Sequence, residues 1–258
     1  MADRSMPSDA PAIAAADLFV RRGPGLPEGA AALTVPGDKS ISHRALLVGA
    51  AAPGATEIVN VNRGTAVTDL WGPLRALGAS LVDEGGTLRL GSLRGPGARP
   101  GAVAGGPHVN VGPSSAAARL LIGLLAGLEI PGVVDGDAVL RQRPMRWLVD
   151  PLRELGAKLD YLGAEGCLPI AVRGGALRDG RVGLNVGSAQ ARSGVVLAAA
   201  AAGRRVTVDH PVQSRDHTER LLAFAGVDLE VTRQAVAVRG GSIGPLPRLE
   251  VPGDPSLA

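Results

Sequence analysis

The chain has 258 residues, 45% of them hydrophobic and only 2% aromatic, with a formal net charge of +3. This length can bury a sizeable core built from Ala, Val and Leu, while the absence of a basic run and the few aromatic side chains argue against nucleic-acid binding. No apolar run is long enough to span a membrane and no export signal is recognised at the N-terminus, so a cytoplasmic protein without membrane contact is expected.

Three similar segments follow one another along the chain. Gly37, Gly112 and Gly187 recur at intervals of 75 residues, each after a short β-like run and before an Ala-, Leu- and Val-rich stretch. Those stretches predict helices at 40–52, 114–127 and 189–203. The β-like runs before them are expected at 32–37, 108–112 and 183–187.

The rest of each segment repeats as well. A second β-like run is predicted at 56–61, 132–136 and 205–210. A second helix, ending on glycine, is predicted at 70–79, 148–157 and 219–227. A hairpin is predicted at 80–91, 158–174 and 229–240. The repeating unit is therefore β-α-β-α-β-β, and three such units suit one compact domain with helices buried inside strands.

The last residues of the chain repeat an earlier sequence motif. Residues 241–250 contain several Gly and Pro residues and are expected to form a linker. Residues 251–254 then repeat the "VPGD" of residues 35–38. This recurrence indicates the beginning of a fourth unit in an interrupted array.

The glycine turns are candidate anion sites, because free N–H groups and the helix dipole favour negative charge at a helix N-terminus. The first turn carries Lys39, Ser40 and Arg44, and Lys39 is one of only two lysines among 27 basic residues. A compact ammonium at such a turn suits a phosphate or a carboxylate. A solvated helix start is the alternative.

The other two turns carry hydroxyl and amide groups. Ser188 and Gln190 can hydrogen-bond a polyhydroxylated ligand or a phosphate oxygen, although Ser188 could equally act as a simple helix cap. The second turn carries Ser114 and Ser115. Arg119, on the helix that follows, is expected to form a structural salt bridge.

The loops before the second helices are also charged. "LRQRPM" offers Arg141 and Arg143, and "SRDHTER" offers Ser214, Arg215, Asp216 and His217. Ser214 or Asp216 can cap the helix, and His217 is not expected to act as a general base with its sequence neighbour Asp216. Four His and one Cys show no metal-ligand spacing, so no metal is expected.

Several of these motifs together resemble 5-enolpyruvylshikimate-3-phosphate synthase over residues 31–258. They are "VPGDKSISHRALLVGA", "RQRPMRWLVDPLRELGAKL", "SAQARSGVVLAA", "SRDHTERLLAFAGVDL" and "VPGDPS". The resemblance implies an α/β fold (α+β by some schemes), an inside-out barrel domain of three β-α-β-α-β-β repeats about a pseudo-threefold axis. It assigns 1–30 to an N-terminal arm and first strand, 31–240 to the three-repeat domain, and 241–258 to a crossover into a second domain.

The resemblance also implies an activity. That reaction transfers the enolpyruvyl group of phosphoenolpyruvate to the 5-hydroxyl of shikimate 3-phosphate without a cofactor or a metal. Lys39 would touch both substrates, and Arg143 would bind phosphoenolpyruvate. The expected contacts to shikimate 3-phosphate are from Ser40, Arg44, Ser188, Ala189, Gln190, Ser214 and Arg215. Gln190 would also reach phosphoenolpyruvate, and a monomer is expected, with or without a separate complementing half.

Two departures from the family pattern bear on phosphoenolpyruvate binding. Pro113 and Ser115 stand where the family has asparagine and glycine, which degrades the site at Ser115, and Arg63 and Gly64 replace an acidic pair. The acid–base groups of the family lie in the second domain, so this half is expected to bind shikimate 3-phosphate weakly and to show no turnover alone.

Two other functions are compatible with the sequence. The sister transferase acting on UDP-N-acetylglucosamine is one, but its usual cysteine is missing from the loop before Pro144, and Cys167 is expected to be a small buried hydrophobe. A non-catalytic anion-binding module, or pseudoenzyme of the same fold, is the other.

Overall fold

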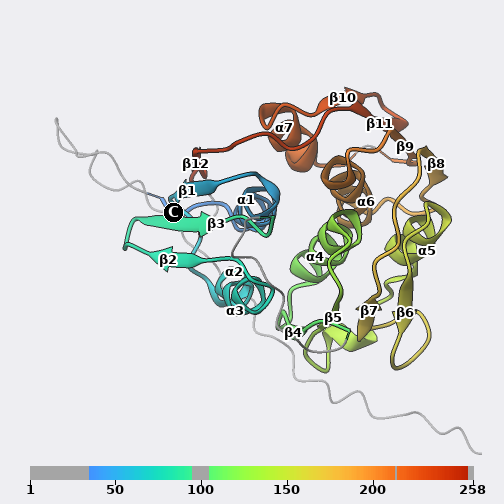
Figure 1. The fold of residues 1–258 in the computed structure, drawn as a ribbon, viewed down its shortest axis with the longest axis horizontal. Helices are drawn as coiled ribbons and strands as arrows, with labels where there is room; N and C mark the ends of the chain where they lie inside the picture. The colour runs from blue at the N-terminus through green and yellow to red at the C-terminus, as the bar shows by residue number, and fades with distance from the viewer. Residues whose placement is uncertain (1–34, 95–104, 213, 255–258) are drawn as a thin grey trace, which may run out of the picture. The chain divides into compact units, whose positions relative to one another are not determined.

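The computed structural model describes residues 35–94, 105–212 and 214–254, which form one compact unit. The arm and strand expected in residues 1–30 lie outside this range, as do residues 32–34 of the β-like run at 32–37. Within the described residues, helices lie inside three four-stranded sheets, as the repeat pattern predicts (Figure 1). The chain therefore has the expected α+β architecture.

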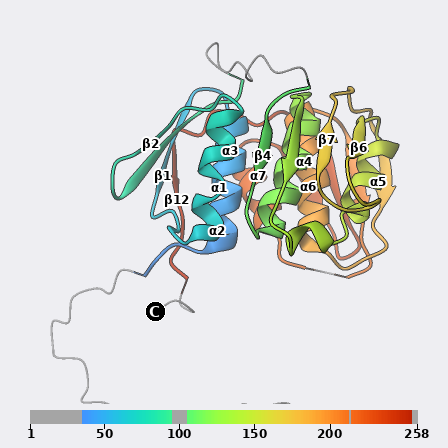
Figure 2. The same cartoon turned by 90° about the horizontal axis from the view of Figure 1, so that it is seen from below.

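Three helices rich in Ala and Leu form the centre. They are α1 (Lys39–Ala51), α4 (Ser115–Leu128) and α6 (Ala189–Ala202), at the predicted positions. They run in the same general direction (Figure 2), and nearly every residue beyond their first turns is buried. Small side chains favour both helix formation and this degree of enclosure.

The three sheets share one pattern. Each begins with a parallel pair and continues with antiparallel strands. The first is β12 (Arg248–Glu250), β1 (Ala55–Val59), β3 (Thr87–Gly91) and β2 (Leu81–Asp83). The second is β4 (His108–Asn110), β5 (Gly132–Asp135), β7 (Ile170–Val172) and β6 (Leu159–Tyr161). The third is β8 (Gly180–Gly183), β9 (Val206–Asp209), β11 (Ala235–Gly240) and β10 (Asp228–Val231).

The second helices pack beside the inner ones. They are α3 (Trp71–Ala76), preceded by the short α2 (Thr65–Thr68), α5 (Arg146–Glu154), and α7 (His217–Phe224). Helix α3 packs on β2 and β4, α5 on α4, α6 and β8, and α7 on α1, α6 and β10. A single 3₁₀ turn, η1 (Leu140–Gln142), precedes α5.

Two predicted boundaries are wrong. The expected linker 241–250 contains β12, which pairs with β1 in parallel just as β4 pairs with β5 and β8 with β9. The first sheet thus takes its first strand from the end of the chain. The strand expected at 183–187 lies at 180–183 instead, because the chain turns after Leu184 toward the start of α6.

The two "VPGD" segments pair with each other. Gly37 and Gly253 form an antiparallel bridge, flanked by hydrogen bonds of 2.9 Å from Asp38 N–H to Pro252 O and from Asp254 N–H to Pro36 O. Asn60, whose φ of 55° is unusual for a residue with a side chain, donates its amide to the carbonyl oxygens of both Val35 (3.3 Å) and Val251 (3.1 Å). The two copies of the motif are therefore adjacent segments of the folded chain.

Helices α4 and α6 meet through glycine. A Cβ on Gly123 would lie 2.2 Å from Gly194 O, and one on Gly127 would lie 2.3 Å from Ala198 O. Only glycine permits backbones to approach this closely. The identity of these residues therefore sets the spacing between the two helices.

We predict that Gly123→Ala destabilises the protein by about 1–3 kcal/mol, because α4 and α6 must move apart. The matched control is Gly72→Ala in α3, where the added methyl meets nothing within 4 Å and the backbone φ is not positive. That change should stabilise by about 0.5–1 kcal/mol. Urea unfolding midpoints would measure both, and equal effects at the two positions would contradict the close-packing argument.

His43 ties α1 to the segment that follows β1. Its ring is 1% exposed, and Nε2 lies 2.8 Å from Ala66 O while Nδ1 lies 2.9 Å from Lys39 O. Burial lowers the pKa of His43, hydrogen bonds to the two carbonyls oppose that effect only in part, and the charges of Arg44 and Lys39 lower the pKa further. The folded protein therefore favours the neutral ring.

Because the unfolded chain takes up a proton on this histidine at about pH 6.5 and the folded chain resists it, stability should fall as pH drops below that value. We predict a larger loss of unfolding free energy between pH 7.5 and 5.5 in the wild type than in His43→Gln. Denaturant titrations at both pH values would measure this. Each protein is compared with itself at pH 7.5, so the stability that the variant loses through poorer packing cancels. Equal losses of unfolding free energy in the two proteins would show that His43 does not contribute to the pH dependence.

Candidate functional site

The N-terminal turns of α1, α4 and α6 come together at one end of the inner helices. Ser114 Oγ lies 3.1 Å from His43 Nε2, Arg44 donates to Ser193 Oγ (3.1 Å), and Arg119 donates to Gln190 Oε1. Each of these contacts joins the beginnings of two inner helices. The positive ends of three helix dipoles therefore lie close to one another.

Each of these helices also begins on a side-chain cap. Asp38 accepts from Ile41 N–H (2.7 Å), Ser114 from Ala117 N–H (3.2 Å) and Ser188 from Ala191 N–H (3.2 Å). Capping is thus a real role of Ser188, as one of the two sequence interpretations held. The cap at the second turn is Ser114, whereas Ser115 is the first residue of α4.

A cavity of about 420 Å³ opens at this end. Seven residues line it: Ser40, Arg44, Ser188, Ala189, Gln190, Ser214 and Arg215. All seven belong to the set predicted from the sequence to contact one ligand. They come from the starts of α1 and α6 and from the loop before α7, which are far apart in the sequence.

Arg44 lies at the base of this cavity and is 3% exposed. Its guanidinium makes four hydrogen bonds to the protein, including Nε to Thr218 Oγ1 (2.6 Å) and Nη1 to Ser40 Oγ (2.8 Å). Burial lowers the pKa of Arg44, while the charges of Glu219 and Asp38 act in the opposite direction. One of its five N–H donors is left for a ligand.

The loop that carries Ser214 and Arg215 is held from beneath. Arg192 donates to Arg215 O (2.7 Å) and to Glu219 Oε1 (2.7 Å), and both charged side chains are at most 3% exposed. A buried pair of this kind is costly to break, because the remaining charge would be uncompensated. The Arg215 side chain stays exposed at the cavity wall.

Three predicted residues do not line the cavity. Lys39 is exposed at the first residue of α1, next to Ser40. Arg143 is exposed at the end of η1, close enough for its charge to lower the pKa of Arg119. Ser115 is half-buried and does not reach the lining.

The loop that leads to Arg143 is anchored by Asp135. Arg141 Nε donates to Asp135 Oδ1 (2.9 Å), Gly136 N–H donates to the same oxygen (2.8 Å), and His108 Nε2 lies 3.2 Å from Oδ2. Burial alone would raise the pKa of Asp135, but these hydrogen bonds lower it overall. Arg141 is therefore a structural residue, and Arg143 is the arginine of this loop that remains available.

Arg119 is the functional candidate that the sequence interpretation missed. It was expected in a salt bridge, but it donates to two neutral acceptors, Gln190 Oε1 and Pro144 O (3.0 Å). Burial lowers the pKa of Arg119, and the charge of Arg143 adds to this. One signal was available in the sequence: Arg119 follows Arg44 by the repeat interval of 75 residues.

The cations around the cavity are not neutralised by ion pairs. Within the described residues, none of the following has a carboxylate oxygen within 4.0 Å: Lys39, Arg44, Arg119, Arg143 and Arg215. Cations that have no carboxylate partner among the described residues, beside three helix N-termini, favour the binding of an anion.

The structure shows where Arg63 and Cys167 lie. Arg63 is paired with Asp83 and lies over the Trp71 ring, 5.9 Å from its centroid, so its charge is directed to the β2–β3 hairpin. Cys167 is half-buried, not buried as expected, because it lies in the turn between β6 and β7.

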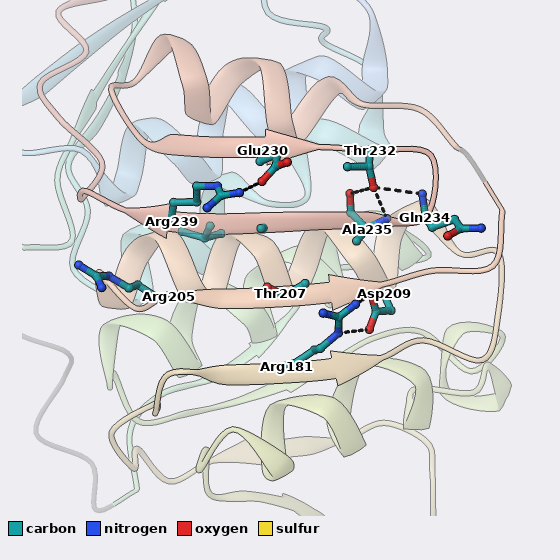
Figure 3. Close-up of a pocket in the computed structure, with 11 residues that line it drawn as sticks. Arg181, Arg205, Thr207, Asp209, Glu230, Thr232, Gln234, Ala235 and Arg239 are labelled. Carbon is teal, nitrogen blue, oxygen red and sulfur yellow. Dashed lines mark hydrogen bonds and ion pairs between the residues drawn. The ribbon is translucent and has the colours of Figure 1, made fainter.

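A larger cavity, of about 570 Å³, lies on the third sheet (Figure 3). Its charged side chains are mostly paired across strands, Arg181 with Asp209 and Arg239 with Glu230. Such ladders are typical of a solvated sheet face. Over the part of the chain that the structure covers, no group of His, Cys, Asp and Glu is arranged for a metal ion, and no helix is long and apolar enough to cross a membrane.

Comparison with known proteins agrees with this geometry. The family profile described as EPSP synthase (3-phosphoshikimate 1-carboxyvinyltransferase) matches residues 28–258. Proteins named 3-phosphoshikimate 1-carboxyvinyltransferase are 41% identical over 235 residues in Anaeromyxobacter dehalogenans and 39% identical over 237 residues in Chloroflexus aurantiacus. Each match covers 88% of this chain and 50% or 52% of the relative, so the chain spans about half the length of these curated relatives.

A solved structure gives the same result. EPSP synthase from Acinetobacter baumannii superposes with a TM-score of 0.76 at 33% identity, over 86% of this chain and 49% of that protein. The family profile, the sequence identity and the fold agree, and the chain belongs to the EPSP synthase family.

Proposed function

We propose that this chain forms the shikimate 3-phosphate-binding part of an enzyme that transfers the enolpyruvyl group of phosphoenolpyruvate to the 5-hydroxyl of that substrate. The observation that carries the proposal is the cavity, whose seven lining residues all come from the set expected to contact shikimate 3-phosphate. The family profile supports the same reaction. The cytoplasmic location and the monomeric state remain predictions.

The proposed roles follow from position and charge. Ser40, Ser188, Ser214 and Arg215 offer hydroxyl and guanidinium donors around the cavity and suit the substrate phosphate. The free N–H of Arg44 and the amide of Gln190 suit the ring hydroxyl and carboxylate groups.

Lys39 and Arg143 lie beside the cavity, not in its lining. They suit the second anion, phosphoenolpyruvate, and the negative charge that develops as phosphate leaves. Their exposure means that closure against further protein would be needed to exclude water from them.

A binding module without turnover is the second candidate, and the composition of the cavity favours it for this chain by itself. None of the seven lining residues is acidic. Of the carboxylates close to these residues in the sequence, Asp38 caps α1, Asp216 is paired with Arg220, and Glu219 is buried against Arg192. The described lining can therefore gather anions, but it contains no carboxylate to move a proton.

The first prediction concerns binding. By titration calorimetry the 258-residue chain should bind shikimate 3-phosphate with a dissociation constant of about 100 μM, and shikimate at least about tenfold more weakly. Arg215→Met should weaken shikimate 3-phosphate binding about tenfold or more. Arg239→Met, which removes a paired arginine from the third sheet, is the matched control and should leave affinity unchanged. Equal affinity for shikimate and its 3-phosphate would refute the assignment of the cavity.

The second prediction concerns turnover. With shikimate 3-phosphate and phosphoenolpyruvate together, the same polypeptide should release no measurable phosphate, because its cavity contains no proton-transferring carboxylate. A continuous phosphate-release assay would test this. Steady-state turnover that disappears in Arg215→Met would show that the binding-module interpretation of the isolated chain is wrong.

A further inference from the structure

We infer that Arg119 is a positioning residue that orients the Gln190 amide toward the ligand and holds the loop end that carries Arg143. This inference deepens the proposed function, because it concerns how the two anion-binding parts of the same site are linked. Arg119 itself is absent from the cavity lining. It acts through the residues that it contacts.

The first contact fixes the direction of an amide. A guanidinium can only donate hydrogen bonds, so the oxygen of Gln190 must face Arg119, and its NH₂ group must point elsewhere. Gln190 also lines the cavity. The contact with Arg119 therefore makes Gln190 a hydrogen-bond donor to whatever anion occupies that space.

The second contact fixes the loop. Arg119 Nη2 donates to the carbonyl of Pro144, which directly follows Arg143. Proline has no N–H, so this carbonyl is the only backbone hydrogen-bonding group at that position. The opposite end of the loop is held by Asp135 and Asp137. Arg119 thus holds this loop at the end that carries Arg143.

The other two repeats contain a similar contact between a side chain and the backbone. In each repeat a buried side chain near the beginning of the inner helix contacts a backbone carbonyl before the second helix: His43 at Ala66 O (2.8 Å), Arg119 at Pro144 O (3.0 Å) and Arg192 at Arg215 O (2.7 Å). The three residues do not occupy equivalent repeat positions, since Arg119 corresponds to Arg44, so what recurs is the kind of contact.

Arg119 differs from the other two in charge. His43 favours its neutral form, and Arg192 is paired with Glu219. Arg119 is 7% exposed and has no carboxylate partner within the described residues, and its charge lies near that of Arg143. An anion held by Gln190 and Arg143 would relieve this unbalanced positive charge, which links the positioning role to ligand binding.

The first experiment needs no ligand. In a ¹H–¹⁵N spectrum of the 258-residue chain, the Gln190 side-chain amide is the pair of signals that disappears in Gln190→Ala. In Arg119→Met that pair should move toward the position of a free glutamine amide. Arg119→Lys keeps the charge but cannot make both diverging contacts, so the pair should move there as well. An unmoved pair in Arg119→Met would overturn the inference.

The matched control is Arg153→Met. Arg153 also contacts a backbone carbonyl, with Nε and Nη2 donating to Leu159 O (3.0 and 2.7 Å), and it lies over the Tyr161 ring. It is outside the cavity lining. Its loss should leave the Gln190 signals in place even if stability falls, which separates positioning from a general structural effect.

The second experiment measures coupling. Arg119→Met should weaken shikimate 3-phosphate binding about tenfold, Arg153→Met should not, and the Arg119→Met, Gln190→Ala double variant should bind about as well as the weaker single variant. Independent, multiplying losses would refute action through Gln190. If the wild type binds no shikimate 3-phosphate, the proposed function fails, whereas the ligand-free spectra still decide the position of Gln190.

Discussion

The candidate site depends on how closely α4 and α6 approach each other. Gly123 and Gly194 let two helix backbones come together where any side chain would separate them. Because of that spacing, Arg119 on one helix can reach Gln190 on the other. A larger residue in the helix contact would therefore change the cavity without touching any of its lining residues.

The three repeats show how one architecture is adapted to separate tasks. Each uses a buried donor to hold the segment before its second helix. The donors are an imidazole, an arginine that has no carboxylate partner among the described residues, and an arginine paired with Glu219. Pairing suits Arg192, since it supports the loop of Arg215 from beneath. The lack of a carboxylate partner in the described residues leaves the charge of Arg119 available to the anion that we propose beside Arg143.

Much of the fold and of the candidate site could be predicted from the sequence, because it depends on local sequence patterns. The helix positions follow from apolar periodicity and terminal glycines, and the cavity residues, at the starts of α1 and α6 and before α7, are those that the family resemblance implies. What could not be predicted depends on distant partners. Strand β12 forms because β1 has a free edge far back in the chain, and the acceptors of Arg119 are defined only after α4, α6 and the Arg143 loop pack together.

The pairing of residues 35–38 with residues 251–254 has a mechanical consequence. The two segments lie side by side at this bridge, and the Asn60 amide donates a hydrogen bond to a backbone carbonyl of each. The bridge therefore holds the first and last described segments of the unit together, directly after β12 pairs with β1.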